Sequence, residues 1–180
     1  MTVVAAWLDS KGPHITSDLA CDSHVRRICT DKVWRSGDVL YGCAGDANAC
    51  AMLYANPFRS KTPGSEWDEV FAIKEVAPHF QSIMEPIDDD CSWIAVAACE
   101  GGLFVFEGDG TVFRVGHDVL CIGSGSEVAY GYLSAVGDLS RKNSNRLAAD
   151  LVTAVAKYIP SVGGGYHYVD LQNEKLEIDE

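Results

Sequence analysis

Thr2 carries two groups that could act together in hydrolysis. If a methionine aminopeptidase removes Met1, the residue bears both a hydroxyl and a free α-amine. A hydroxyl is a weak nucleophile and needs a nearby base, which an uncharged amine can supply. The sequence therefore allows a nucleophile and its base in one residue. The alternative is that threonine stands here because it favours strands.

Asp18 and Lys32 are candidates to support that chemistry. Asp18 falls in the second expected strand and Lys32 at the head of the third, so a hairpin beside the first strand could bring both to the N-terminal end. A lysine near the α-amine would lower the pKa of the amine by like-charge repulsion, and an aspartate would hold the lysine in place. The alternative is an ion pair on the surface of a hairpin.

Two glycine-rich turns could contribute further groups. The segment "GCAGDA" at 42–47 leads from a strand into a helix, and its first glycine, Gly42, could present a backbone N–H to an oxyanion. Glycines at such a junction also serve close packing. The segment "GSGS" at 123–126 could hold phosphate at a helix N-terminus. It lacks the lysine of a P-loop and the third glycine of a dinucleotide fingerprint, so phosphate binding is not favoured.

Most of these residues fall in the first half of the chain, where we expect strands followed by helices. Alternating apolar residues and turn signals predict strands at 2–8, 13–23, 32–35 and 39–45. Asp46 is expected to cap a helix that runs to Asn56. A second helix is expected over 65–84, with a capping box at Ser65 and Asp68, and Pro78 should kink it or end it early.

The second half repeats this order. Strands are expected at 91–99, 103–108 and 111–115, then a strand, a Gly-Ser loop and a helix over 119–136, a helix over 144–159 and a last strand over 163–172. Two blocks of strands, each followed by helices, predict an α+β fold in which two antiparallel sheets stack face to face with helices outside. We expect one domain over residues 1–180.

Composition restricts the partners. A net charge of -12 without a basic cluster argues against nucleic acid and against anionic membranes. No apolar run is long enough to span a membrane and no signal peptide is evident, so we expect a cytoplasmic protein.

Metal binding and disulfides are not expected. The seven cysteines form no C-x-x-C pair and mostly lie in apolar runs, which is typical of reduced core residues. The five histidines lack ligand spacing, and "CDSH" at 21–24 is interpreted as a turn. The aspartates at 88–90 lack the alternation of a calcium loop. We therefore expect no metal and no cofactor.

The order of the motifs resembles the proteasome β-subunit family. The resemblance covers most of the chain and consists of Thr2, "TSDLA" at 16–20, "DKVW" at 31–34, "LYGCAGDA" at 40–47 and "VLCIGSGSEVAYGYL" at 119–133. The ending "GYHYVDL" is similar to the bacterial HslV-type peptidases.

This resemblance implies a four-layer αββα fold of the N-terminal-nucleophile hydrolases and a role for each matching residue. It implies Thr2 as nucleophile, Asp18 and Lys32 as its supporting pair, Gly42 as oxyanion donor and Ser124 as the hydroxyl near the amine of Thr2. It further implies that an apolar pocket for the side chain before the cut bond is lined by Trp34, Leu40 and Ala44.

Three features depart from the family pattern. The segment between Asp18 and Lys32 is about two residues short, which a loop can absorb. The segment "IPSVGGG" at 159–165 lacks the Asp and Ser that proteasomes carry before their last strand, an Asp that HslV-type enzymes also lack. We expect no propeptide before Thr2 beyond Met1, so exposure of Thr2 should depend on methionine removal.

The implied function is a threonine-type endopeptidase that cuts polypeptides inside a homo-oligomeric ring, a stacked hexamer or heptamer. An ATP-dependent unfoldase is a candidate partner of this ring. Two alternatives stay open. One is a catalytically silent ring subunit that retains Met1. The other is a small-molecule amidase of the same fold.

Overall fold

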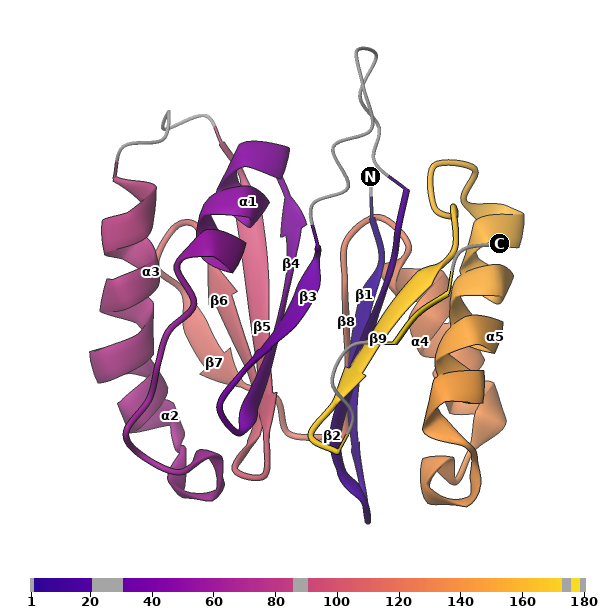
Figure 1. Cartoon of the computed structure of the whole chain (residues 1–180), viewed down its shortest axis with the longest axis horizontal. Helices are drawn as coiled ribbons and strands as arrows, with labels where there is room; N and C mark the ends of the chain where they lie inside the picture. The colour runs from indigo at the N-terminus through magenta and orange to yellow at the C-terminus, as the bar shows by residue number, and fades with distance from the viewer. Residues whose placement is uncertain (1, 21–30, 86–90, 173–175, 179–180) are drawn as a thin grey trace.

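The structure is a computed structural model that describes residues 2–20, 31–85, 91–172 and 176–178. Two five-stranded antiparallel sheets stack in the middle of the molecule, and helices cover the outer face of each (Figure 1). The expected α+β fold of four layers, αββα, is confirmed.

The first sheet holds the N-terminal strand near its centre. Its strand order is β10-β9-β2-β1-β8. The strands span Val4–Asp9 (β1), Gly12–Asp18 (β2), Val119–Ile122 (β8), Tyr166–Asp170 (β9) and Leu176–Ile178 (β10). The hairpin of β1 and β2 places Val4 opposite Ser17, so the end of β2 lies beside the start of β1. Asp18 is therefore brought next to Thr2 by the hairpin register.

The second sheet has the order β3-β4-β5-β6-β7. Its strands span Val33–Ser36 (β3), Val39–Gly45 (β4), Trp93–Cys99 (β5), Gly102–Glu107 (β6) and Val112–Arg114 (β7). The pairing of β3 with β4 sets Val33 opposite Gly42, and the backbone N–H of Cys43 donates to the carbonyl of Lys32 at 2.9 Å. Lys32 thus lies near the end of β4 from which the first helix leaves.

The helices divide between the two outer layers. On the second sheet lie Ala47–Ala55 (α1), Gly64–Glu66 (η1), Glu69–Phe71 (α2), Ala72–Val76 (η2) and Ala77–Met84 (α3), and on the first sheet Ser126–Val136 (α4), Leu139–Arg141 (η3) and Ser144–Tyr158 (α5). In the described residues no helix combines the length and the apolar character that crossing a bilayer would require.

Strand alternation builds three apolar layers from these elements. Ala5 and Trp7 of β1, and Val3 just before it, face α4 and α5. The residues between them, Val4 and Ala6, face the second sheet and pack in the layer between the sheets. Because this middle layer consists of Val, Ala, Ile and Leu without aromatic rings, the two sheets can approach closely.

Helix α1 begins as expected, but the next helix does not. Asp46 caps α1, since its carboxylate accepts from the backbone N–H groups of Asn48 and Ala49 at 2.8 and 3.3 Å. The expected start at Ser65 is wrong. Residues 64–66 form a short 3₁₀ turn, and Asp68 caps α2 by accepting from the N–H of Phe71 at 2.7 Å.

Pro78 neither ends the helix nor leaves it regular. A π-helical segment, η2, precedes it, and the helix continues through α3 with proline in its first turn. The wider π turn accommodates a residue that has no N–H and whose ring crowds the preceding carbonyl. Among the cysteines of the described part, Cys43, Cys50, Cys99 and Cys121 are free thiols. Cys21, Cys29, the "CDSH" segment and the aspartates at 88–90 lie outside the described residues.

Candidate functional site

Thr2 and Asp18 meet at the end of the first sheet. The hydroxyl of Thr2 donates to Asp18 Oδ1 at 3.0 Å, and the backbone N–H of Val3 donates to the same oxygen at 3.0 Å. Both residues are buried, Asp18 completely. A buried carboxylate needs such donors, because burying its charge without them is costly. Asp18 therefore fixes both the side chain of Thr2 and the backbone that follows it.

Lys32 reaches the same carboxylate from the second sheet. Its ammonium donates to Asp18 Oδ1 at 2.9 Å and to the carbonyl of Ala20 at 2.6 Å. The lysine side chain is 10 % exposed and that of Asp18 is 0 % exposed, so the pair is shielded from solvent. One carboxylate oxygen thus holds the Thr2 hydroxyl and the Lys32 cation on either side of it.

The side chain of Ser124 contacts the backbone of Thr2. Ser124 Oγ accepts from Thr2 N at 3.2 Å and donates to Thr2 O at 3.3 Å, and the N–H of Gly125 donates to the same carbonyl at 3.3 Å. The loop at 123–125 therefore binds Thr2 by its nitrogen and its carbonyl oxygen.

The two glycines of this loop permit the close approach. A Cβ on Gly123, whose φ is +86°, would lie 2.3 Å from the carbonyl oxygen of Thr2. A Cβ on Gly125 would lie 2.9 Å from Cβ of Val3. The "GSG" sequence is thus required for the serine to reach Thr2 at all.

The structure does not give Gly42 the role expected of it. Gly42 lies in the middle of β4, opposite Val33 on one side and Val96 on the other. Alternate residues of a paired strand send their N–H groups to opposite neighbours, so the N–H of Gly42 belongs to the ladder with β5. A Cβ here would lie 2.7 Å from Val4 and 2.8 Å from Ile15. Gly42 is a site of close packing between the sheets.

Gly45 is a better candidate for that donor, and the sequence interpretation missed it. It shares the orientation of Cys43, whose N–H donates to Lys32, so the same alternation directs the Gly45 N–H towards the side of Lys32. Gly45 has a φ of +122°, and a Cβ would lie 2.3 Å from the carbonyl oxygen of Ser92, so only glycine fits. The signal in the sequence is its place directly before the helix cap Asp46.

The three residues expected to line one pocket do not lie together. Trp34 packs on the helix-covered face of the second sheet, where its ring stacks on Tyr41 with centroids 5.9 Å apart. Leu40 and Ala44 lie on the opposite face, between the sheets, and Leu40 is fully buried. Because neighbouring strand residues alternate between faces, Trp34 and Leu40 cannot line the same cavity.

Two thiols lie close to Lys32 and were also missed. Cys43 of β4 and Cys50 of α1 belong to the same buried cluster beneath the helices. A hydrogen bond from the Cys43 thiol lowers the pKa of Cys50, and the positive charge of Lys32 lowers it further. The same thiol–thiol bond raises the pKa of Cys43. The alternation that places Cys43 opposite Lys32 was readable in the sequence, but the approach of Cys50 was not.

Within the residues that the structure describes, no three His, Cys, Asp or Glu side chains are grouped so that they could hold a metal ion.

Comparison with known proteins identifies the fold. No family model matches the chain, and no curated protein matches it. Solved structures, in contrast, match nearly the whole chain. The BPH protein of Thiobacillus denitrificans in complex with epoxomicin is 19 % identical, with a TM-score of 0.74 over 99 % of this chain and 100 % of that one.

Two other structures are similar over nearly the whole chain. Eukaryotic HslV from Trypanosoma brucei is 15 % identical, with a TM-score of 0.67 over 98 % of this chain and 100 % of that one. The Anbu complex of Pseudomonas aeruginosa, solved as a helical assembly, is 15 % identical, with a TM-score of 0.72 over 99 % of this chain and 87 % of that one. The chain therefore has the proteasome-like fold, and identities of this size establish nothing finer.

Proposed function

We propose that the protein is a threonine-type endopeptidase with Thr2 as its N-terminal nucleophile. The observation that carries the proposal is the buried contact of Thr2 with Ser124 and with Asp18, whose carboxylate also binds Lys32, so that four separate parts of the chain meet there. Burial of an Asp–Lys pair is costly and by itself gives little net stability. Its position on the hydroxyl of Thr2 is what a reactive residue would require.

In the proposed reaction, the α-amine of Thr2 takes the proton of the hydroxyl, and Oγ1 attacks the carbonyl carbon of a peptide bond. The Gly45 N–H stabilises the oxyanion that forms. The C–N bond then breaks, and the leaving amine takes the proton from the α-amine. Water, activated by the same amine, adds to the resulting ester and releases the acid and the free hydroxyl.

The surrounding residues hold these atoms in position. Asp18 orients the hydroxyl by accepting from it, and Lys32 supplies positive charge beside it. Ser124 contacts the nitrogen that becomes the base once the residues before Thr2 have been removed. The mechanism thus needs a free amine on Thr2, because an acylated nitrogen has no basic lone pair.

We further propose that the protein acts as a homo-oligomeric ring. An exposed peptidase site of this kind would cut other proteins indiscriminately, and enclosure prevents this. The proposal is supported by the likeness to HslV and to an Anbu complex solved as a helical assembly. Light scattering of the full chain should give a multiple of the 19.4 kDa protomer mass. A species of protomer mass at working concentrations would contradict it.

Intact-mass spectrometry with epoxomicin, the ligand of the similar BPH structure, tests the proposed activity. We expect the mass of a chain that begins at Thr2 and, after incubation with epoxomicin, the mass of one adduct per chain. Thr2→Ala should give no adduct and should cut no peptide. A chain that retains Met1 and takes up no epoxomicin would contradict the proposal and favour a silent ring subunit. Turnover of acyl-amino acids but not of peptides would favour an amidase.

A further inference from the structure

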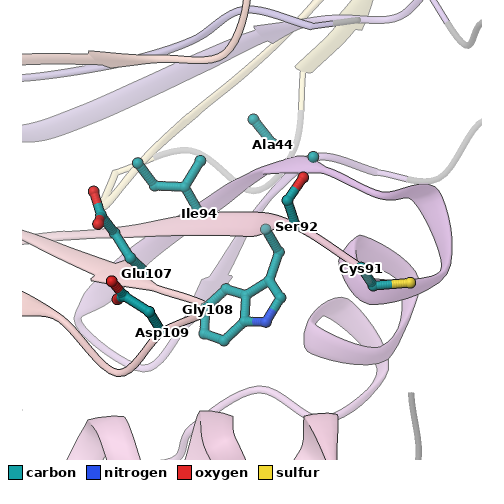
Figure 2. A pocket seen from close by; sticks show the side chains of 9 residues that line it. Ala44, Cys91, Ser92, Ile94, Glu107, Gly108 and Asp109 are labelled. Carbon is teal, nitrogen blue, oxygen red and sulfur yellow. The ribbon is translucent and has the colours of Figure 1, made fainter. Parts of the chain in front are cut away.

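A cavity of about 520 Å³ opens beside the end of β4 (Figure 2). Ala44 and Gly45 form one part of its wall, and Glu107 and Asp109, from the end of β6 and the turn after it, form another. Gly45 is the residue whose N–H is directed towards Lys32. Gly45 therefore borders both the cavity, which lies over β5 and β6, and the point on the β3 side of β4 where the proposed reaction would hold the substrate carbonyl.

The wall of the cavity changes from apolar to acidic across the second sheet. Ala44 is paired with Ile94, and Ile94 with Glu107, so the three residues stand in one row over β4, β5 and β6. In Figure 2 the side chain of Ile94 lies between those of Ala44 and Glu107. Since neighbouring strands are about 4.8 Å apart, the acidic end of the row lies about 10 Å from β4.

The carboxylates at that end are available to a ligand. Among the described residues, no lysine, arginine or histidine forms an ion pair with Glu107 or Asp109. Asp109 stays ionised at neutral pH, because the backbone N–H of Thr111 donates to its carboxylate at 2.8 Å and lowers its pKa.

An apolar surface that leads to an unpaired carboxylate suits a side chain with an apolar stem and a positive end. Lysine and arginine have this form, and their stems pack on apolar surface while the charged end stays in polar surroundings. A stem lying over the partly exposed Ile94 would bring the charge to Glu107. A short side chain would not span the row, and an acidic one would be repelled.

We propose that this cavity binds a lysine or arginine side chain of the polypeptide substrate, and that Glu107 sets this preference. The inference rests on the proposed function, because it takes the ligand to be a polypeptide held at Gly45.

Peptide binding to the inactive full-length variant Thr2→Ala tests the inference without requiring catalysis. The probes are fluorescein-labelled octapeptides that carry a single lysine at each position in turn, each compared with its norleucine counterpart by fluorescence anisotropy. We expect one position at which lysine binds about twofold to fivefold more tightly than norleucine, the range for a partly exposed ion pair. The preference should weaken as salt is raised.

Glu107→Gln in the Thr2→Ala background should abolish the preference while leaving the norleucine peptide unaffected. Glu100→Gln is the matched control, because Glu100 is exposed in the turn at the opposite end of β5 and its replacement changes the net charge equally. A lysine preference at no position, or one that survives Glu107→Gln, would overturn the inference.

Epoxomicin labelling of the chain with Thr2 intact separates the two proposals. A lysine preference that depends on Glu107 but no adduct on Thr2 would support the cavity and contradict the peptidase. An adduct on Thr2 with no such preference would support the peptidase and contradict the cavity.

Discussion

Lys32 from the second sheet and Asp18 from the first form a shielded ion pair across the end of the two sheets, with Nζ 2.9 Å from Oδ1. The pair joins the two sheets at the residue that also binds the hydroxyl of Thr2. Breaking such a buried pair by removing one charge leaves the other uncompensated. The same carboxylate should therefore be required for stability and for reactivity.

Asp18→Asn should destabilise the protein by about 3–5 kcal/mol, because the charge of Lys32 loses its buried counter-ion. The reaction of Thr2 with epoxomicin should slow in the fraction that remains folded. Urea unfolding and the rate of adduct formation measure the two effects. Asp150→Asn is the control, since its pair with Arg146 is exposed and should change the stability by less than about 0.5 kcal/mol. Equal losses in the two variants would contradict the role of the buried pair.

Ser124→Ala should slow epoxomicin labelling while leaving the fold intact. The hydroxyl makes two contacts of 3.2 and 3.3 Å with the backbone of Thr2, and their loss should cost about 1 kcal/mol of positioning, a decrease of about fivefold to tenfold in rate. The glycines on both sides keep the loop against Thr2. Labelling kinetics measure the decrease in rate. A thermal melt should show a melting temperature that is unchanged within a few degrees. An unchanged rate would exclude Ser124 from the site.

The sequence was sufficient to predict most of the fold and the residues that meet at Thr2. Hairpin turns and alternation fix the register, which brings Asp18 beside Thr2 whatever the details of packing. Asp46 was predictable as a helix cap for a similar reason, because capping is local. The strand β10, at the edge of the first sheet, was not expected, since its three residues carry too short a pattern.

The errors arose where tertiary contacts decide between two local signals. Ser65 and Asp68 both suit a helix start, and the chain uses Asp68. Gly42 and Gly45 both suit a turn. Because β4 is paired with a strand on each side at Gly42, the N–H of Gly42 is not free to bind an oxyanion. The prediction of one pocket for Trp34 and Leu40 is wrong, because strand alternation, with the turn between them, sets the two side chains on opposite faces of the sheet.

The two glycines of β4 should respond differently to alanine. Gly42→Ala forces a methyl against the ends of two side chains, Val4 and Ile15, which can shift, so we expect a loss of about 1–3 kcal/mol in stability and a labelling rate changed by less than about twofold.

Gly45→Ala instead combines a φ of +122° with a contact to the carbonyl oxygen of Ser92, so the end of β4 must move. A displacement of about 1 Å there should slow labelling by about a hundredfold. Denaturant unfolding of both variants measures the loss of stability, and epoxomicin kinetics measure the labelling rate. If Gly42→Ala abolishes labelling of folded protein while Gly45→Ala labels normally, the proposed oxyanion donor is wrong.

Cys50 should ionise at a lower pH than Cys43, Cys99 and Cys121. The hydrogen bond from Cys43 and the charge of Lys32 both lower its pKa, whereas burial raises the pKa of Cys99 to about 11 and that of Cys121 to about 12. As the pH rises, the thiolate of Cys50 should therefore form before those of Cys43, Cys99 and Cys121. The ultraviolet absorbance of thiolate, taken as the difference between the protein and its Cys50→Ser variant over a pH titration, measures this step.

Cys43→Ala provides the test of cause. It removes the largest influence on Cys50, so the pKa of Cys50 should rise and its titration should move to higher pH. The charge of Lys32 remains, so the shift should be partial. Cys121→Ala, in the layer beneath the opposite helices, should leave the titration of Cys50 in place. A titration unchanged by Cys43→Ala, or moved equally by Cys121→Ala, would show that the two thiols beside Lys32 are not coupled.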